Sequence, residues 1–285
     1  MNIIKTVQQL KAYVQEEKRL GRQIGLVPTM GFLHEGHLSL AKRAREENET
    51  VIMSIFVNPL QFGPNEDFEQ YPRDLERDAK LAASAGVDCI FAPSVEEMYP
   101  EPPMIKMTVT DRTDKLCGEK RPGHFDGVVT VVSKLFHLTE ADQAYFGLKD
   151  AQQFAVIEGL VKSLNFPVKL VGVETVREED GLAKSSRNIY LTVEERQKAP
   201  HLQRGLQAGV QVAEQGEKDP YRVQEAAREY LLAYSGADLD YVELLSYPEL
   251  KELERVEGRM ILAAAVKYSK ARLIDNIIFS VNEGK

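Results

Sequence analysis

Two histidines, His34 and His37, occur where a short apolar run passes through a glycine-bearing loop into a helical pattern. The apolar run covers residues 24–27, the loop begins at Pro28, and the amphipathic stretch covers residues 38–47. A helix N-terminus offers unpaired backbone N–H groups and a partial positive charge, and imidazoles add further donors. The pattern therefore favours binding of an anion, in particular the phosphates of a nucleotide.

Other interpretations of the two histidines remain open. Zinc ligation would need a further strong ligand, and the sequence has neither an HExxH motif nor a CxxC pair. The histidines could also cap the helix and pack the loop without touching a ligand. The sequence lacks GxxxxGK[ST] and GxGxxG, which argues against a P-loop and against the dinucleotide fingerprint.

Three further groups of polar residues follow an expected strand or lie in an expected helix or at its start. The amides of Asn58 and Gln61 follow the second strand, where they could bind hydroxyls and carboxylates or simply form an Asn-Pro turn. Asp78 lies in an expected helix, where it could hold Mg²⁺ through water or serve as a partner of the helix dipole. Lys149 is expected at a helix start, where a cation is disfavoured unless an anion is bound. Gln153 follows one turn later.

The bulk composition excludes several classes of protein. The 285 residues are 43% hydrophobic and 28% charged, with a net charge of −8 and a pI near 5.4. These values argue against disorder and against a general nucleic-acid binder. The two cysteines, Cys89 and Cys117, do not form a disulfide framework by spacing, and no signal peptide or run of 18 apolar residues is found. We expect a cytoplasmic protein without a membrane or nucleic-acid partner.

Apolar strand patterns alternate with amphipathic helical patterns over the first two thirds of the chain, as in a mainly parallel, doubly wound α/β sheet. Strands are expected at residues 24–27, 51–57, 89–92, 105–109, 143–146 and 168–173. Helices are expected at residues 5–20, 38–48, 73–85, 127–138 and 150–164. Ligands of such sheets bind beyond the carboxyl ends of the strands, and the histidine loop follows the first expected strand.

The pattern changes after about residue 180. Helices are expected at 193–215 and 219–234, and strands at 241–245, 260–266 and 273–279. This predicts a Rossmann-like domain over residues 1–180 and a smaller α+β lid domain over residues 181–285, with a hinge in the charged loop at 177–181.

Six motifs in order give the chain a wider resemblance. They are PTMGFLHEGH, FVNPLQF, YPRD, RPGHFDGV, FGLKDAQQ and KSSRN. Up to about residue 190, this order resembles the pantothenate synthetase (pantoate–β-alanine ligase) family of the HxGH nucleotidyltransferase superfamily. The segment 34–37 resembles the HxGH element and 184–187 a distant counterpart of the KMSKS loop. Phe32 departs from the alanine that the family often has.

The resemblance implies a two-step, AMP-forming ligase. Pantoate would attack the α-phosphate of ATP to give pantoyl adenylate and pyrophosphate, and the amine of β-alanine would then displace AMP to give pantothenate. It also implies Mg²⁺ and a homodimer. The nearest alternatives are a nucleotidyltransferase that stops at a nucleotidylated product and a nucleotide-binding regulatory module without catalysis.

The resemblance also implies roles for individual residues. The catalytic groups would be His34, His37, Lys149 and Arg187. Because adenylyl transfer spreads negative charge over phosphate oxygens, we favour charge stabilisation by His37 over the proton-donor role that the family implies. The implied ATP contacts are Met30, Gly31, Phe32, Leu33, His34, Glu35, Gly36, His37, Gly147, Leu148, Lys149, Asp150, Val176, Lys184, Ser185, Ser186 and Arg187. Pantoate would contact Gln61, Gln153 and Asn58, β-alanine would contact Gln61, and Asp78 would hold Mg²⁺.

Overall fold

The structure is a computed structural model that describes residues 1–64, 66 and 68–281. The chain divides into two compact units. The first comprises Met1–Thr113, Arg121–Leu148 and Val156–Glu174, and the second comprises Asp114–Lys120, Lys149–Ala155 and Thr175–Lys285. The sequence predicted one boundary after residue 180, and it did not foresee that two short earlier segments belong with the second unit.

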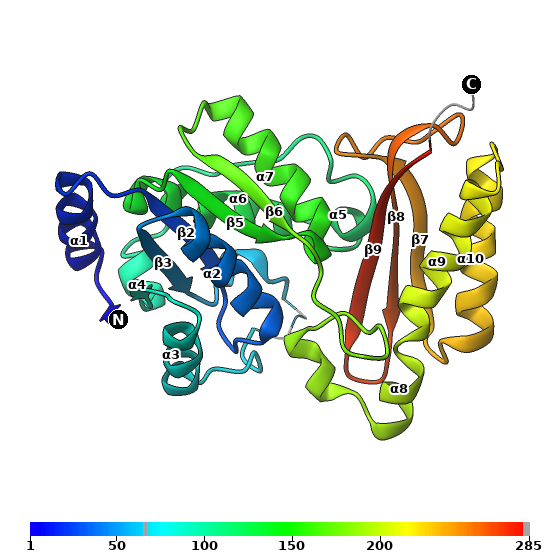
Figure 1. The fold of residues 1–285 in the computed structure, drawn as a ribbon, viewed down its shortest axis with the longest axis horizontal. Helices are drawn as coiled ribbons and strands as arrows, with labels where there is room; N and C mark the ends of the chain where they lie inside the picture. Colours follow the sequence, from blue (N-terminus) through cyan, green and yellow to red (C-terminus); the bar gives the residue numbers. More distant parts are fainter. Residues whose placement is uncertain (65, 67, 282–285) are drawn as a thin grey trace. The chain divides into compact units, whose positions relative to one another are not determined.

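The first unit contains a six-stranded sheet with the order β1-β4-β3-β2-β5-β6, and every neighbouring pair is parallel (Figure 1). The predicted parallel, doubly wound sheet is thereby confirmed. The strands are β1 (Asn2–Ile4), β2 (Ile24–Thr29), β3 (Thr50–Ile55), β4 (Cys89–Phe91), β5 (Gln143–Gly147) and β6 (Lys169–Val173).

Helices cover the sheet because its strands are apolar on both faces. Leu40 and Ala41 of α2 pack with Val27 and Met53 of the sheet, and α6 contacts β2 and packs with α1. In Figure 1, α2 lies in front of the sheet and α6 behind it. The helical segments of this part of the chain are α1 (Val7–Arg19), α2 (Glu35–Glu47), η1 (Pro59–Gln61), α3 (Leu75–Ser84), α4 (Val95–Met98), α6 (His124–Thr139) and α7 (Ala151–Leu164), the last beginning in the second unit.

The strand order fixes where a ligand is expected. The chain runs outward from β2 through β3 to β4, and then returns to place β5 on the other side of β2. This reversal is a topological switch point, and open α/β sheets bind ligands beyond the carboxyl ends of the strands there. Those ends are Thr29 of β2 and Gly147 of β5. The histidine loop therefore starts at the switch point.

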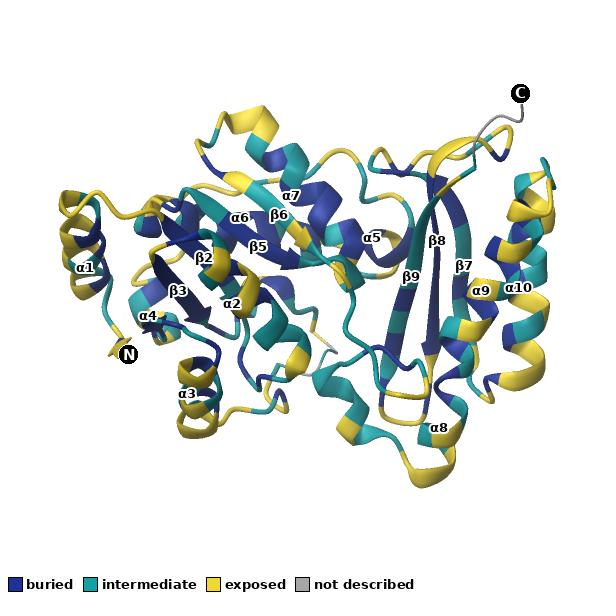
Figure 2. Ribbon diagram, viewed as in Figure 1, coloured by how far each residue is buried: buried dark blue, intermediate teal, exposed yellow. Residues whose placement is uncertain are grey.

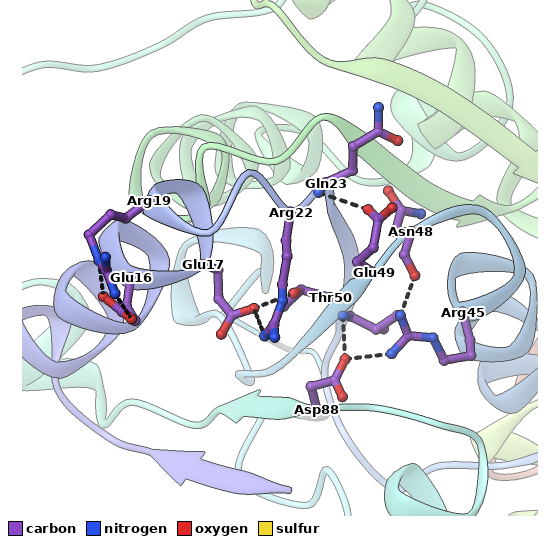
Figure 3. Close-up of polar contacts among 11 residues, drawn as sticks. Glu16, Glu17, Arg19, Arg22, Gln23, Arg45, Asn48, Glu49, Thr50 and Asp88 are labelled. Carbon is purple, nitrogen blue, oxygen red and sulfur yellow. Dashed lines mark hydrogen bonds and ion pairs between the residues drawn. The ribbon is translucent and has the colours of Figure 1, made fainter.

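The opposite, amino-terminal edge of the same sheet is closed by ion pairs (Figure 3). The buried carboxylate of Glu17 accepts from Arg22 at 2.9 Å and from the hydroxyl of Thr50 at 2.5 Å. Asp88 accepts from Arg45 at 2.7 Å and from a backbone N–H of β3 at 2.8 Å. The acidic and basic side chains thus pair with one another, and Asp88 also accepts from a backbone N–H of β3. We therefore assign this edge of the sheet a structural role.

The second unit contains an antiparallel three-stranded sheet, β7 (Asp238–Ser246), β8 (Gly258–Lys267) and β9 (Arg272–Val281), in that order. The central strand β8 is buried along almost its whole length (Figure 2). Two long helices, α9 (His201–Glu214) and α10 (Pro220–Tyr234), pack on the sheet and on each other. The shorter segments are α5 (Leu116–Lys120), η2 (Leu148–Asp150, shared with the first unit), η3 (Ser186–Tyr190) and α8 (Val193–Lys198). The predicted α+β arrangement is confirmed.

Two sequence predictions were wrong. Residues 105–109 form no strand: the N–H of Val109 donates to the carboxylate of Asp126 at 2.9 Å, and Ile105 is 79% exposed. The single helix expected at 193–215 is two helices, because Pro200 has no N–H with which to continue the first. The short elements β1 and α5 were not foreseen.

We predict opposite effects of alanine at two helical glycines of the first unit. A Cβ on Gly127 of α6 would lie 2.2 Å from the carbonyl oxygen of Leu60, so Gly127→Ala must displace the η1 backbone. Overpacking of this kind costs about 1–3 kcal/mol of unfolding free energy. At Gly159 of α7 the nearest atom is 3.9 Å away, so Gly159→Ala should be neutral or stabilise by up to about 1 kcal/mol. The midpoint of urea unfolding of each variant measures the change in stability. Equal midpoints for the two variants would contradict the packing argument.

Candidate functional site

The loop between β2 and α2 is held in a conformation that requires glycine. Gly31 and Phe32 both have left-handed backbone angles, with φ of 88° and 48°. A Cβ on Gly31 would lie 2.9 Å from the side chain of Ile55 and 3.1 Å from that of Asp78. The loop therefore folds tightly against β3 and α3 before it enters α2.

The backbone N–H groups of this loop are already hydrogen-bonded within the protein. Asp78 accepts from the N–H groups of Phe32 and Leu33 at 2.7 Å each, and the N–H of Gly31 points at the hydroxyl of Thr29 at 3.2 Å. Arg77 adds a bond to the Leu33 carbonyl at 2.9 Å. The sequence predicts that loop N–H groups bind an anion, whereas the N–H groups of residues 31–33 are bonded within the protein.

Asp78 does not fit the Mg²⁺ role expected for it. Its side chain is 1% exposed, and each carboxylate oxygen accepts a short bond from a backbone N–H. Burial raises the pKa of Asp78, while the bonds from Leu33 and Phe32 act in the opposite direction. The side chain is closed off from solvent, both oxygens are bonded to N–H donors, and the Arg77 guanidinium lies 3.3 Å from Oδ1, so this environment disfavours a cation or its water shell. Its observed role is to hold the histidine loop.

The two histidines form a reciprocal cap on α2. Nδ1 of His34 accepts from the N–H of Gly36 at 3.1 Å, and Nδ1 of His37 accepts from the N–H of His34 at 3.3 Å. A ring nitrogen that accepts a hydrogen bond carries no proton, so each neutral imidazole carries its proton on Nε2. The ring centroids are 4.0 Å apart. The pair therefore presents two Nε2–H donors, which suit phosphate oxygens and oppose metal ligation through Nε2.

Gly36 is required by the position of the first ring. A Cβ at this position would lie 2.9 Å from Cε1 of His34 and 3.0 Å from its Nδ1. Any side chain here would push the ring away from the helix start. The glycine of the His-Glu-Gly-His segment thus leaves room for the His34 ring, to which its own N–H donates.

Gln61 is oriented by a buried amide network. The side chain of Asn58 is 1% exposed and donates to Oε1 of Gln61 at 3.2 Å and to the carbonyl of Gly127 at 3.0 Å. Its own oxygen accepts from the hydroxyl of Tyr99 at 3.0 Å. Gln61 then directs Nε2 toward the sulfur of Met30 at 3.2 Å. Asn58, expected to bind a ligand, is engaged at both ends and instead holds Gln61.

His124 supports the same turn from the other side. Arginine can only donate, so Nε2 of His124, 3.0 Å from Arg121, must accept, and Nδ1–H donates to the carbonyl of Gln61 at 2.8 Å. Arg121 is itself paired with Glu66 through both nitrogens of its fork. Glu66, Arg121 and His124 therefore form a series of side-chain contacts, and the last of them is a hydrogen bond to the backbone carbonyl of Gln61.

In the second unit, Lys149 and Gln153 lie around the start of α7. The ammonium of Lys149 is 3.9 Å from the carboxylate of Asp150, and Asn276 of β9 donates to the Lys149 carbonyl at 2.9 Å. Lys149 lies in η2, just before α7, where the sequence placed it. Gly147, which precedes it in the first unit, has open space around the position of a Cβ.

The segment that carries the expected phosphate clamp is also in the second unit. Lys184 donates its backbone N–H to the carbonyl of Val176 at 2.9 Å, which brings two expected ATP contacts together across a hairpin. Ser185 caps η3 by accepting from the N–H of Arg187 at 3.2 Å. The ammonium of Lys184 pairs with Glu178 at 2.9 Å.

The expected site residues thus fall into two sets. Residues 30–37, Asn58, Gln61, Asp78, Gly147 and Leu148 belong to the first unit. Lys149, Asp150, Gln153, Val176 and residues 184–187 belong to the second unit. Sequence reasoning missed the residues that hold these groups, such as Tyr99, Arg121 and Asp275. The one signal it could have used was an Asp-Asn pair, 275–276, between apolar residues in the middle of a strand.

Three further observations concern metals, thiols and membranes. Over residues 1–64, 66 and 68–281, no three His, Cys, Asp or Glu side chains gather closely enough to hold a metal ion. Cys89 and Cys117 are buried free thiols. None of the described helices is both long enough and apolar enough to cross a membrane.

Comparison with known proteins supplies the family. The model of the family described as Pantoate-beta-alanine ligase matches residues 2–278. The chain is 59% identical to a pantothenate synthetase of Bacillus pumilus, covering 99% of the chain and 98% of the relative. It is 57% identical to that of Bacillus subtilis, covering 99% of each.

Solved structures agree with this result. A pantothenate synthetase of Thermus thermophilus superposes with a TM-score of 0.92 at 48% identity, covering 97% of this chain and 99% of that one. A pantoate-beta-alanine ligase of Francisella tularensis, complexed with beta-gamma ATP and beta-alanine, gives a TM-score of 0.79 at 34% identity, covering 98% and 97%. The chain belongs to the pantoate–β-alanine ligase family and is an enzyme of the pantothenate synthetase type.

Proposed function

We propose that the enzyme joins pantoate to β-alanine through a pantoyl adenylate. A pantoate carboxylate oxygen attacks the α-phosphorus of ATP, and pyrophosphate leaves. The β-alanine ammonium first loses one proton to solvent, and its amine nitrogen then attacks the acyl carbon. The bond between the acyl carbon and the AMP oxygen breaks, AMP leaves, and the new amide nitrogen loses a second proton to solvent. Activation by ATP is needed because a carboxylate oxygen is a poor leaving group until it becomes part of a mixed anhydride with phosphate, from which AMP can leave.

The observation that carries the proposal is the pair of Nε2–H donors on His34 and His37 beyond the end of β2. Charge spreads over the phosphate oxygens during adenylyl transfer, and fixed donors stabilise it without reorganisation. Because each Nδ1 accepts from a backbone N–H, these bonds favour ring orientations in which Nε2–H remains the donor. We therefore assign His37 to charge stabilisation, acting as a hydrogen-bond donor.

We assign the remaining ATP contacts to side chains of both sets. Lys149 and Arg187 neutralise phosphate charge, and the hydroxyls of Ser185 and Ser186 assist with Lys184. Gly147 and Leu148 line the nucleotide site with Asp150, and Val176 lies near the adenine. Residues 30–37 contribute through Met30 and the two histidines, since their N–H groups are engaged elsewhere. Mg²⁺ enters with ATP, and no carboxylate is assigned to it.

For pantoate and β-alanine we propose the two glutamines. Gln61 is held with a defined amide orientation by Asn58, and Gln153 lies in the first turns of α7. The Francisella tularensis relative was solved with β-alanine and an ATP analogue, which supports these substrate classes.

We also propose a cytoplasmic homodimer. The free thiols of Cys89 and Cys117 fit a reducing compartment. The side chains of Met104 and Ile105 are 94% and 79% exposed, and burial against a second copy would remove this apolar surface from water. Sedimentation velocity measures the assembly directly, and a monomer at micromolar concentration would refute the dimer.

The proposed reaction makes a prediction about products. The enzyme with ATP, Mg²⁺ and pantoate should release pyrophosphate in an amount close to that of the enzyme, because the adenylate stays bound. Adding β-alanine should start steady turnover and produce AMP and pantothenate in equal amounts. Product chromatography follows both steps. A nucleotidylated product that persists with β-alanine present would refute the second step, and no pyrophosphate with pantoate would refute the first.

Loss of a charge-stabilising donor should slow adenylate formation. We expect His37→Ala and Lys149→Ala each to reduce pantoate-dependent pyrophosphate release by about 10²–10³-fold, the usual scale for one such donor. The controls are His137→Ala and Lys162→Ala, whose side chains are exposed on α6 and α7. Single-turnover kinetics provide the measurement. A near-normal rate in either site variant would remove that residue from the proposed mechanism.

We expect Gln61 to contribute to the binding of pantoate and not to the binding of ATP. We expect Gln61→Ala to raise the KM for pantoate by about tenfold or more, because an amide partner is removed from a desolvated site. Calorimetric titration should show ATP affinity within about twofold of the original, and Gln207→Ala on the exposed side of α9 is the control. A loss of ATP affinity equal to the loss for pantoate would contradict the assignment.

A further inference from the structure

A short hairpin in the second unit joins several of the proposed ATP contacts. Lys184 N–H bonds to the carbonyl of Val176 at 2.9 Å, and Glu178 N–H bonds to the carbonyl of Leu182 at 2.8 Å. Arg177 and Ala183 form an antiparallel β-bridge between these two hydrogen bonds. The hairpin therefore fixes Val176 relative to Lys184, and residues 185–187 follow directly.

One arginine ties this hairpin to the C-terminal strand β9. Arg177 donates to both carboxylate oxygens of Asp275, at 2.6 and 3.1 Å, and to the carbonyl of Gly181 at 3.1 Å. Asp275 is buried, at 3% exposure. The neighbouring pairs, Lys184 with Glu178 and Arg196 with Asp180, do not involve the sheet. Of these three ion pairs, only that of Arg177 fixes the hairpin to β9.

The next residue of β9 holds a second proposed ATP contact. Asn276 donates through Nδ2 to the carbonyl of Lys149 at 2.9 Å. Its own N–H is 2.9 Å from Oδ1 of Asp275, the oxygen that also accepts from Arg177. Two successive residues of one strand therefore hold the backbone at Lys149 and the hairpin before Ser185.

We propose that Asp275 and Asn276 are positioning residues for ATP. Asp275 acts through Arg177 on the hairpin, and Asn276 acts through the backbone of Lys149. The inference rests on the proposed function, since it assumes that Lys149 and residues 184–187 bind ATP. Its physical basis is that catalytic groups misplaced by about 1 Å lose about 10²-fold in rate, so an anchor common to several groups affects all of them.

The same sheet provides a matched control. Asp240 of β7 is also a buried carboxylate, paired with Arg272 at 2.9 Å and with Lys267 at 2.8 Å. Neither partner belongs to the hairpin or to the segment of Lys149. Asp240→Asn thus removes an ion pair of similar burial from the same sheet, and it reports what the loss of such a pair costs by itself.

The test compares the kinetic constants of Asp275→Asn and Asp240→Asn in pantoate-dependent pyrophosphate release. The assay temperature is well below the melting temperature of either variant. We expect Asp275→Asn to raise the KM for ATP by about tenfold or more, with the KM for pantoate within about twofold, because a misplaced hairpin weakens the phosphate contacts. Asp240→Asn should leave both constants within about twofold. If Asp275→Asn does not fold, Arg177→Lys takes its place, since it keeps the charge but loses the fork.

Asn276 is tested by its effect on kcat. Asn276→Asp removes the donor to the Lys149 carbonyl with little change in volume, and we expect kcat to fall about tenfold. Asn276→Gln keeps an amide donor and should recover part of the loss. Equal effects of the Asp and Gln variants would overturn the role of Asn276.

Two outcomes separate this inference from the proposed function. Equal constants for Asp275→Asn and Asp240→Asn, or equal losses for ATP and pantoate, would overturn the role of Asp275. If the unaltered enzyme releases no pyrophosphate with pantoate, the proposed function fails. ATP calorimetry on the same variants then still tests the positioning, because binding needs no turnover.

Discussion

The buried carboxylate of Asp78 is the constraint on which the histidine loop depends. A loop that turns through two left-handed residues exposes consecutive N–H groups, and burial without partners would cost each of them about 1–3 kcal/mol. Asp78 accepts from the N–H groups of Phe32 and Leu33, and Thr29 lies within reach of the one before. The loop is therefore rigid before any ligand arrives, and the helix that begins at Glu35 has a fixed start.

Because the backbone N–H groups of the loop are bonded within the protein, other groups must supply the donors for a ligand. A loop with open N–H groups would bind phosphate through the main chain, as P-loops do. Here the main-chain donors of residues 34 and 36 are bonded to imidazole nitrogens. In the mechanism that we propose, the imidazoles donate through Nε2 in place of the backbone. The helix cap sets the tautomer of both side chains.

A similar division between contact and support recurs elsewhere in both units. Gln61 is held by Asn58, Tyr99 and the His124 chain, and the segment of Lys149 is held by β9. The supporting groups are hydrogen-bonded and wholly or partly buried, while the supported groups carry the chemistry that we propose. Such support matters because polar contacts are directional, and an unsupported amide or ammonium would lose orientation that binding would then have to restore.

The amino-acid sequence by itself determined the parallel sheet, the α+β unit after it and the family, because apolar periodicity and ordered motifs are local properties of the chain. It also identified His34, His37, Gln61 and Lys149 as candidates from residue type and position. It erred at 105–109, where apolar residues have no strand partner, and it did not foresee that the buried side chains of Asp78 and Asn58 bond to distant backbone groups. Only the tertiary structure decided those roles, since the partners lie 46 residues from Asp78 and 69 from Asn58. A hydrogen bond depends on direction and distance in space, and no local pattern records which distant N–H or carbonyl a buried side chain will meet.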